Sequence, residues 1–205
     1  MSRRERLERA FLYLVVEAGW ASRLDSALRG GVDVVQLRDK ELSDGELLEA
    51  ARAFRRACDE HGALFVLNDR ADLVLEADAD GVHVGRRDTP VAEARRLVGD
   101  DRLVGLSIEA PEQLDAVEGA DYLGVGAVFR TPTKEDATVT GLDLVATASR
   151  RARVPVFAIG GIDETNVAEV VRAGGRRVAV VRAIRDADDP EIAARRLRAY
   201  LERRP

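Results

Sequence analysis

Cysteine is nearly absent from this 205-residue sequence, which contains only Cys58. A single thiol excludes a disulfide framework and a cysteine-based zinc site, and it is typical of a small buried hydrophobic residue. No stretch approaches the roughly 20 apolar residues that a membrane-spanning helix needs. The first residues also lack the apolar core and small-residue cleavage site of a secretory signal. We therefore expect a protein of the cytoplasm without a membrane partner.

Lysine and side-chain amides are also scarce. Of the 32 basic residues, 30 are arginines. The remaining lysines and the amides are Lys40, Lys134, Gln36, Gln113, Asn68 and Asn166. In this arginine-rich background, a lysine or an amide is a weak indication of chemistry that arginine or aspartate cannot supply. The net charge of −5 disfavours a nucleic-acid partner, which would need a basic excess on one face.

Short β-branched runs alternate with longer helical patterns along the whole chain. The predicted strands are Phe11–Val16, Asp33–Arg38, Leu64–Leu67, Gly81–Val84, Leu103–Ser107, Tyr122–Val125, Val156–Ile159 and Arg177–Val181. The predicted helices include Asp44–His61, Val91–Val98, Pro111–Glu118, Glu164–Ala173 and Pro190–Arg203. No linker rich in Pro, Gly or Ser divides the chain, so we expect residues 1–205 to form one domain.

Eight strand–helix units in a chain of this length predict an α/β fold, a single-domain (β/α)8 TIM barrel. An open, doubly wound sheet is the structural alternative. Active sites of barrels lie where the strands end, so polar residues at those positions are informative. The segment 126–141 is the longest without a predicted element, and such a loop in a compact barrel is more often functional than decorative.

Three polar residues share one face where the second predicted strand ends. Gln36, Arg38 and Lys40 alternate with apolar Leu37, so the two-residue strand period turns them the same way. An amide, a guanidinium and an ammonium together suit a phosphate or a diphosphate. The alternative is a strand end in which these cations form salt bridges with neighbouring acidic residues.

Aspartates follow the third and fourth predicted strands, at Asp69 and Asp88. Each has an ordinary interpretation as a helix N-cap, and Asp88-Thr-Pro90 fits one well. The sharper interpretation joins the two, because carboxylates on neighbouring loops can share a divalent cation such as Mg²⁺. The sequence leaves both interpretations open.

Two later segments also suit anions. Arg130-Thr-Pro-Thr-Lys134 offers hydroxyl groups and an ammonium within the long loop, although a turn set by its proline explains it equally well. Gly160 and Gly161 follow the seventh strand, and Arg182 follows the eighth. Loops after these two strands often bind phosphate in this fold. By contrast, His61 and His83 are typical of structural histidines, and the sequence has no Walker loop or nucleophile elbow.

Together these segments resemble the thiamine phosphate synthases. The motifs that carry the resemblance, in chain order, are Gln36-Leu-Arg-Asp-Lys40, Asn68-Asp-Arg-Ala-Asp72, Gly81-Val-His-Val-Gly85 with Asp88, Tyr122-Leu-Gly-Val-Gly126, Thr131-Pro-Thr-Lys134 and Ala158-Ile-Gly-Gly-Ile162. The resemblance runs from the first strand to the eighth. It implies a TIM barrel that joins a pyrimidine diphosphate to a thiazole phosphate and releases pyrophosphate.

The resemblance also implies a role for each matching residue. The pyrimidine diphosphate would be held by Gln36, Arg38, Lys40, Asn68, Ser107 and Lys134. The thiazole phosphate would be held by Thr131, Thr133, Gly161, Val181 and Arg182. Asp69 and Asp88 would bind Mg²⁺, and Arg38, Lys40 and Lys134 would be catalytic because they absorb the charge of the leaving diphosphate.

Several positions depart from the family's usual pattern. Arg86 stands where Gln is usual, Ile108 where Thr is common, and Arg182 where Ser is usual. Val16-Glu17 replaces the usual Thr-Asp after the first strand. These changes touch the rim of the expected site, so they bear on substrate details more than on the reaction class.

Three other functions compete with the synthase. One of them, another phosphate-binding barrel enzyme of amino-acid biosynthesis, would explain Gly161 but not the residues suited to a diphosphate. A thiazole tautomerase-like isomerase shares the barrel, but its expected His near the end of the fifth strand is missing from the segment 106–111. A non-catalytic barrel that binds a phosphate metabolite would not need two lysines and two aspartates suited to a leaving group. The sequence does not decide the oligomeric state, a homo-oligomer included.

Overall fold

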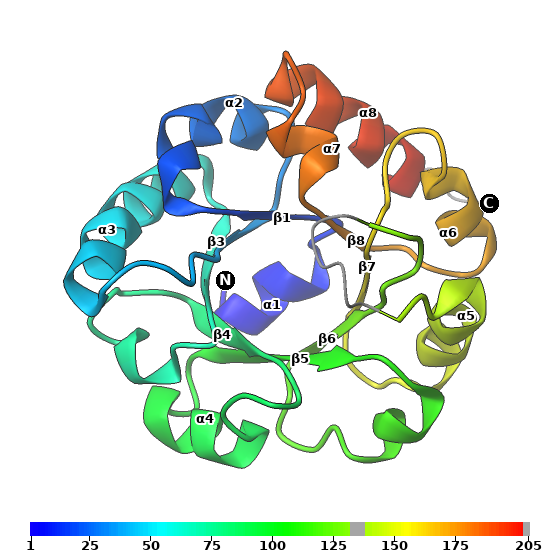
Figure 1. Cartoon of the computed structure of the whole chain (residues 1–205), viewed down its shortest axis with the longest axis horizontal. Helices are drawn as coiled ribbons and strands as arrows, with labels where there is room; N and C mark the ends of the chain where they lie inside the picture. The colour runs from blue at the N-terminus through cyan, green and yellow to red at the C-terminus, as the bar shows by residue number, and fades with distance from the viewer. Residues whose placement is uncertain (132–137, 203–205) are drawn as a thin grey trace.

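The computed structural model describes residues 1–131 and 138–202. Its parallel strands form a closed barrel in chain order, from β1 to β8, and β8 pairs with β1 (Figure 1). The strands are β1 Leu12–Val16, β2 Val34–Leu37, β3 Leu64–Asn68, β4 Gly81–Val84, β5 Leu103–Ile108, β6 Tyr122–Val125, β7 Val156–Ile159 and β8 Val178–Val180. The predicted TIM barrel is confirmed, and the open sheet is wrong because β1 and β8 pair.

Helices surround the barrel, as Figure 1 shows. The α-helices are α1 Arg3–Glu8, α2 Leu24–Arg29, α3 Asp44–His61, α4 Val91–Val98, α5 Gly141–Arg151, α6 Val167–Arg172, α7 Arg182–Arg185 and α8 Pro190–Glu202. The 3₁₀ helices are η1 Ala18–Arg23, η2 Ala71–Leu73 and η3 Pro111–Asp115. Within the described part of the chain, none of the helices is long and apolar enough to cross a membrane.

Helix boundaries agree with the prediction where capping signals are strong. α3 begins after Ser43, whose hydroxyl accepts from the Glu46 amide in a capping box, and it ends at Gly62 in a left-handed conformation with φ 68°. Two predicted helices are wrong in extent. The one expected over 111–118 is the short 3₁₀ helix η3, and the one expected from Glu164 begins at Val167, because a turn held by Asn166 Oδ1 precedes it.

The apolar residues form two layers, inside and outside the strands. In β1, Tyr13 and Val15 face the barrel interior, whereas Leu12, Leu14 and Val16 pack against the helices. This is the two-residue period of a strand applied to a sheet that is covered on both faces. Side chains from other strands complete the interior cluster, among them Val34, Leu64, Val66, Leu103, Tyr122 and Phe157.

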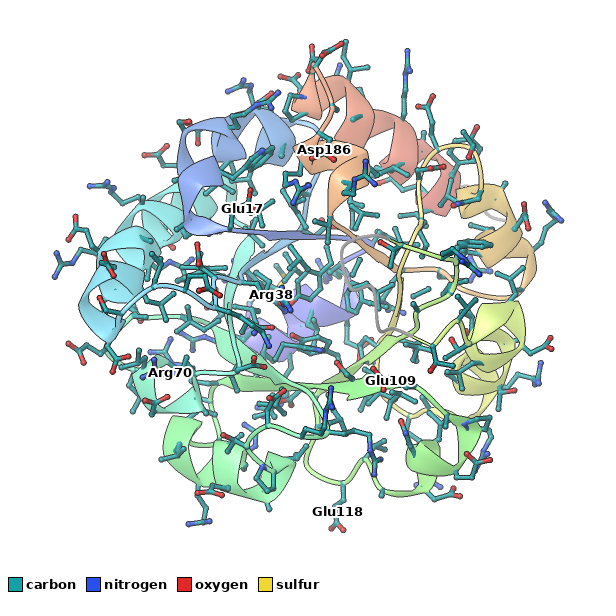
Figure 2. The ribbon with its side chains drawn as sticks, viewed as in Figure 1. Glu17, Arg38, Arg70, Glu109, Glu118 and Asp186 are labelled. Carbon is teal, nitrogen blue, oxygen red and sulfur yellow. The ribbon has the colours of Figure 1, made fainter. Side chains whose placement is uncertain are left out.

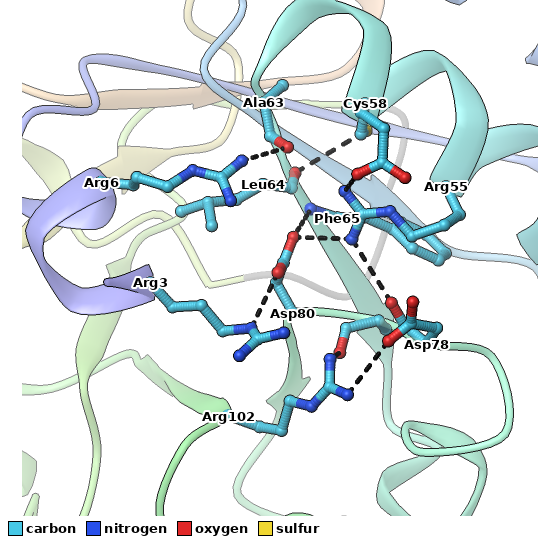
Figure 3. A network of polar contacts seen from close by, with 12 residues as sticks. Arg3, Arg6, Arg55, Cys58, Ala63, Leu64, Phe65, Asp78, Asp80 and Arg102 are labelled. Atoms are coloured by element: carbon cyan, nitrogen blue, oxygen red, sulfur yellow. Dashed lines mark hydrogen bonds and ion pairs between the residues drawn. The ribbon is translucent and has the colours of Figure 1, made fainter. Parts of the chain in front are cut away.

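Aspartates that precede β2, β4 and β6 connect the N-terminal ends of adjacent strands through hydrogen bonds. Asp33 Oδ2 accepts from the Leu12 amide at 3.0 Å, Asp80 Oδ2 from the Phe65 amide at 2.9 Å, and Asp121 Oδ2 from the Val104 amide at 2.8 Å. Each aspartate also pairs with at least one arginine. Figure 3 shows the buried Asp80 between Arg3 and Arg55.

Helix α1 closes the barrel at the N-terminal ends of the strands. Figure 1 shows it across the centre of the ring of strands, and Leu7 joins the interior apolar cluster. Arg3 and Arg4 of the same helix pair with Asp80 and Asp121 at 2.8 and 2.7 Å. With this end closed, a ligand enters the barrel from the C-terminal ends of the strands.

Candidate active site

A cavity of about 960 Å³ opens at the C-terminal ends of the strands. Its volume lies at the upper end of the usual range for ligand pockets and leaves room for two small reactants. Figure 2 shows Arg38 above the centre of the barrel, with Glu17, Glu109 and Asp186 around it. The described residues that were predicted to bind substrate or metal all line this cavity: Gln36, Arg38, Lys40, Asn68, Asp69, Asp88, Ser107, Thr131, Gly161, Val181 and Arg182.

The predicted anion cradle at the end of β2 points into the cavity. Lys40 Nζ lies 3.7 Å from Asp69 Oδ2, so its closest acidic partner belongs to the next strand. Asp39 instead accepts hydrogen bonds from the backbone amides of Ala18 and Glu41. Salt bridges of Arg38 or Lys40 to Asp39 or Glu41 do not occur among the described residues, so that alternative is wrong.

Asp69 and Asp88 face each other across the ends of β3 and β4. Burial raises the pKa of the Asp69 carboxyl, the Asp88 carboxylate raises it further, and Lys40 opposes both effects. Asp69 also adopts a left-handed conformation with φ 62°, which is uncommon outside glycine. Two oxygen-bearing groups that repel each other in this way are the donor set that a hard divalent cation prefers.

Neither aspartate caps a helix. The N-cap of α4 is Pro90, and the residue that precedes η2 is Arg70, in both cases without a side-chain capping bond. Asp88 Oδ2 instead accepts from the Gly85 amide at 2.8 Å, which fixes this carboxylate at the end of its own strand. The helix-cap interpretation is therefore wrong for both residues, and the residues fit the Mg²⁺ expected from the family resemblance.

His83 and Ser107 form part of the cavity floor. His83 Nε2 lies 3.0 Å from Ser107 Oγ, and Nδ1 is buried without a hydrogen-bond partner among the described residues. Burial lowers the pKa of His83 to about 4, so the ring is neutral at physiological pH. Gly124 leaves room for this ring, because a Cβ there would come within 3.1 Å of it.

Glycines at the ends of β6 and β7 bring two loops together on the opposite wall. A Cβ at Gly161 would lie 2.7 Å from the Arg130 carbonyl oxygen, and Gly161 has φ 66°. The Phe129 amide donates to the Gly160 carbonyl at 2.9 Å and holds the loop in place. Thr131 lines the cavity at this point, whereas the predicted ligands Thr133 and Lys134 lie outside the described residues.

At β8, Val181 precedes the short helix α7, and Arg182 is its first residue. Nε of Arg182 donates to Asp186 Oδ2 at 2.8 Å, and the side chain is half exposed at the cavity rim. This is the pairing expected of a surface arginine. The backbone amides that open α7 have no intrahelical acceptor, so they remain available to an anion.

A family model described as thiamine monophosphate synthase matches residues 12–184. The chain belongs to this family. The match includes every strand of the barrel and every described residue assigned above to a substrate or a metal.

Individual members of the thiamine monophosphate synthase family agree over nearly the whole chain. The thiamine-phosphate synthase of Thermobifida fusca is 48% identical over 207 residues, covering 97% of this chain and 95% of that protein. That of Nostoc punctiforme is 45% identical and covers 98% of this chain, which spans only 58% of the Nostoc protein's length. A solved thiamine phosphate pyrophosphorylase from Pyrococcus furiosus superposes with a TM-score of 0.88 at 34% identity, covering 97% of both chains.

More distant structures share the fold alone. A 3-hexulose-6-phosphate synthase superposes with a TM-score of 0.68 at 20% identity. Within the family fold, the residues that sequence reasoning missed are those on the cavity floor: Tyr13, His83, Tyr122 and Phe157. Tyr13, Tyr122 and Phe157 continue the apolar pattern of barrel strands, so a single sequence does not distinguish them from core residues.

Proposed function

We propose that this chain joins an aminopyrimidine methyl diphosphate to a thiazole phosphate, forming thiamine phosphate and pyrophosphate. The observation that carries the proposal is the convergence of the cradle Gln36, Arg38 and Lys40 with the carboxylate pair Asp69 and Asp88 in one cavity. The match to the Thermobifida protein covers nearly the whole of both chains, which supports a single catalytic domain that spans residues 1–205.

Charge neutralisation drives departure of the leaving group. The carbon–oxygen bond of the pyrimidine methylene breaks, the diphosphate leaves with the bonding electron pair, and the thiazole nitrogen forms the new carbon–nitrogen bond. Arg38 and Lys40 bind the diphosphate, together with Lys134 as the family resemblance implies. Asp69 and Asp88 would hold Mg²⁺, which would supply further neutralisation of the diphosphate charge.

The rest of the site positions the reactants. Ser107, Asn68 and Gln36 contact the pyrimidine diphosphate, whereas Thr131, Gly161 and the backbone at 181–182 hold the thiazole phosphate, with Thr133 added from the resemblance. Holding two reactants in one geometry replaces an encounter in solution, an effect worth up to roughly 7–11 kcal/mol. The reaction needs no protein nucleophile, because the thiazole nitrogen is the attacking atom.

The isomerase alternative fits the site less well. β5 ends in Ser107 and Ile108, and Glu109 follows, so this rim offers no imidazole. His83, which lines the cavity floor, has a lowered pKa and pairs with Ser107. A non-catalytic phosphate-binding barrel would gain nothing from carboxylates that repel each other when no cation is present.

An omission assay tests the proposed function. The purified chain is incubated with both substrates and Mg²⁺, and parallel reactions omit one component at a time. We expect thiamine phosphate only in the complete mixture. Conversion of the thiazole phosphate alone would instead support an isomerase, and binding of either substrate without any conversion would support a non-catalytic barrel.

A further inference from the structure

A chain of buried polar groups runs beneath the proposed pyrimidine site. Gln36 is 4% exposed, and its Nε2 donates to Tyr13 Oη at 2.8 Å. Tyr13 Oη lies 2.9 Å from Tyr122 Oη on the far side of the barrel interior. Both tyrosines are about 2% exposed or less, so the chain lies in a region that bulk water does not reach.

This chain of hydrogen bonds fixes which end of the Gln36 amide faces a ligand. One N–H of its NH₂ group donates to Tyr13, which turns the amide nitrogen toward the floor and the carbonyl oxygen Oε1 toward the cavity. Tyr13 Oη accepts from Gln36, and Tyr122 Oη at 2.9 Å is an acceptor within reach of the Tyr13 proton. Without that acceptor, the Tyr13 hydroxyl could donate to the Gln36 carbonyl and reverse the amide.

At Ser107 the floor presents a hydrogen-bond donor instead of an acceptor. A neutral imidazole carries one N–H. On Nε2 of His83 this N–H has an acceptor in Ser107 Oγ, whereas on Nδ1 it would be buried without an acceptor among the described residues. The Ser107 hydroxyl then points its proton away from His83. The floor therefore offers an acceptor at Gln36 and a donor at Ser107.

Aromatic packing keeps this arrangement in place. The ring of Phe157 contacts Tyr13 edge-on, with centroids 5.4 Å apart, and Tyr122 in the same way at 5.8 Å. Gly105 provides the space for Tyr122, since a Cβ there would lie 2.1 Å from Tyr122 Cζ. Such a packed floor leaves the two hydroxyl groups few alternative positions.

We propose that Tyr13 and Tyr122 are positioning residues that hold the Gln36 carbonyl toward the cavity, so that the site selects an aminopyrimidine over the corresponding oxopyrimidine. The inference rests on the proposed function for the identity of the substrate. An amino group donates and its neighbouring ring nitrogen accepts, which matches the floor. In the oxo form the exocyclic oxygen accepts and the ring nitrogen donates, which reverses both positions.

Calorimetric binding of two probes tests this inference. The probes are the 4-amino-2-methyl-5-hydroxymethylpyrimidine diphosphate and its 4-oxo analogue, measured with wild-type protein, Tyr13→Phe and Tyr122→Phe. We expect wild type to prefer the amino probe, and each variant to lower the ratio of the two affinities about five- to tenfold, the loss typical of one hydrogen bond. Tyr200→Phe is the control, because it removes the hydroxyl of the third tyrosine, in α8 outside the described cavity lining, and should leave the ratio unchanged.

The outcomes separate this inference from the proposed function. Unchanged selectivity in both tyrosine variants, with wild-type selectivity intact, would overturn the positioning role alone. A wild-type protein that binds both probes equally would overturn it as well, whether or not the protein makes product. Wild-type selectivity that falls in the tyrosine variants, without any formation of thiamine phosphate, would instead contradict the proposed reaction and leave the positioning role supported.

Discussion

At the scale of single residues, the most informative feature is the unfavourable arrangement of Asp69 and Asp88. Burial and the neighbouring Asp88 carboxylate raise the pKa of Asp69, and Asp69 has an unfavourable backbone conformation as well. Residues that serve stability alone rarely combine both features. The arrangement is explained if a cation binds between them and reverses the repulsion.

Asp88→Asn tests this explanation. The amide keeps an acceptor for the Gly85 amide but removes one charge, so without Mg²⁺ the melting temperature should stay equal to that of wild type or rise. Turnover should fall at least about a hundredfold, because a lost metal ligand removes several kcal/mol of charge stabilisation. Added Mg²⁺ should raise the melting temperature of wild type but not of the variant.

The matched control for this measurement is Asp72→Asn. Asp72 lies in the same segment as Asp69 but pairs with Arg70 at the surface. This variant should keep both turnover and the response to Mg²⁺. A normal rate in Asp88→Asn would contradict the proposed metal role.

His83 predicts how stability depends on pH. Its pKa is about 4 in the folded protein, below the ordinary value of 6.5, so the unfolded chain binds the additional proton first as the pH falls. The stability contributed by neutral His83 is therefore complete above pH 6.5. It is lost between pH 6.5 and 4, by roughly 3 kcal/mol in total.

Urea unfolding of wild type and His83→Gln across this pH range measures the effect. The variant should show a flatter dependence of the free energy of unfolding on pH between 6.5 and 4. His61→Gln, which replaces the chain's other histidine, at the surface, gives the reference slope. Equal slopes for the two variants would contradict the burial of a neutral imidazole at position 83.

The residues at strand ends could be predicted from the sequence, whereas those on the floor could not. Gln36 interrupts an apolar strand, and Arg38 and Asp88 follow strand ends, where polar residues are visible in one sequence. Tyr13 and Tyr122 continue the apolar pattern, and their polar role depends on hydrogen bonds across the barrel. The contact between the two tyrosines joins residues 109 positions apart, which no local pattern reports.

At the scale of elements, the end of the barrel opposite the active site is a stabilising layer. Burial alone would raise the pKa of Asp80, but the Phe65 amide and Arg55 outweigh it and keep the pKa below the ordinary value. The charge is thus paired and hydrogen-bonded, which a buried carboxylate requires. Helix α1 adds Arg3 to this network and closes the barrel.

Asp80→Ala should destabilise the fold without affecting chemistry. The change leaves Arg55 and the Phe65 amide without their buried acceptor, at a cost of about 3–5 kcal/mol in the free energy of unfolding. Asp59→Ala removes an exposed partner of the same Arg55 and should cost at most about 1 kcal/mol. Denaturant unfolding measures both, and folded Asp80→Ala should retain its specific activity.

Most elements could be predicted from their patterns, and the exceptions are short. α3 and α4 have the predicted boundaries because capping or a proline defines them. Helix α1 was missed because it has six residues and one buried apolar side chain, which is too little for a helical period. Its signal is the capping box between Ser2 and Glu5.

At the scale of the whole molecule, the stabilising ion pairs and the cavity lie at opposite ends of the barrel. Arginine–aspartate pairs and α1 close one end, and the cavity opens at the other. The order of strands around the barrel brings β2, β3 and β4 side by side. This places Lys40 next to Asp69 and Asp69 next to Asp88, so the cradle and the carboxylate pair form one continuous site.

The most direct test of this account is the stoichiometry of products formed by the purified chain. Thiamine phosphate and pyrophosphate are quantified together over time, with both substrates and Mg²⁺ at saturating concentrations. The account predicts that the two products appear at the same rate, one molecule of each per turnover. Pyrophosphate released without thiamine phosphate, or no product at all, would contradict it.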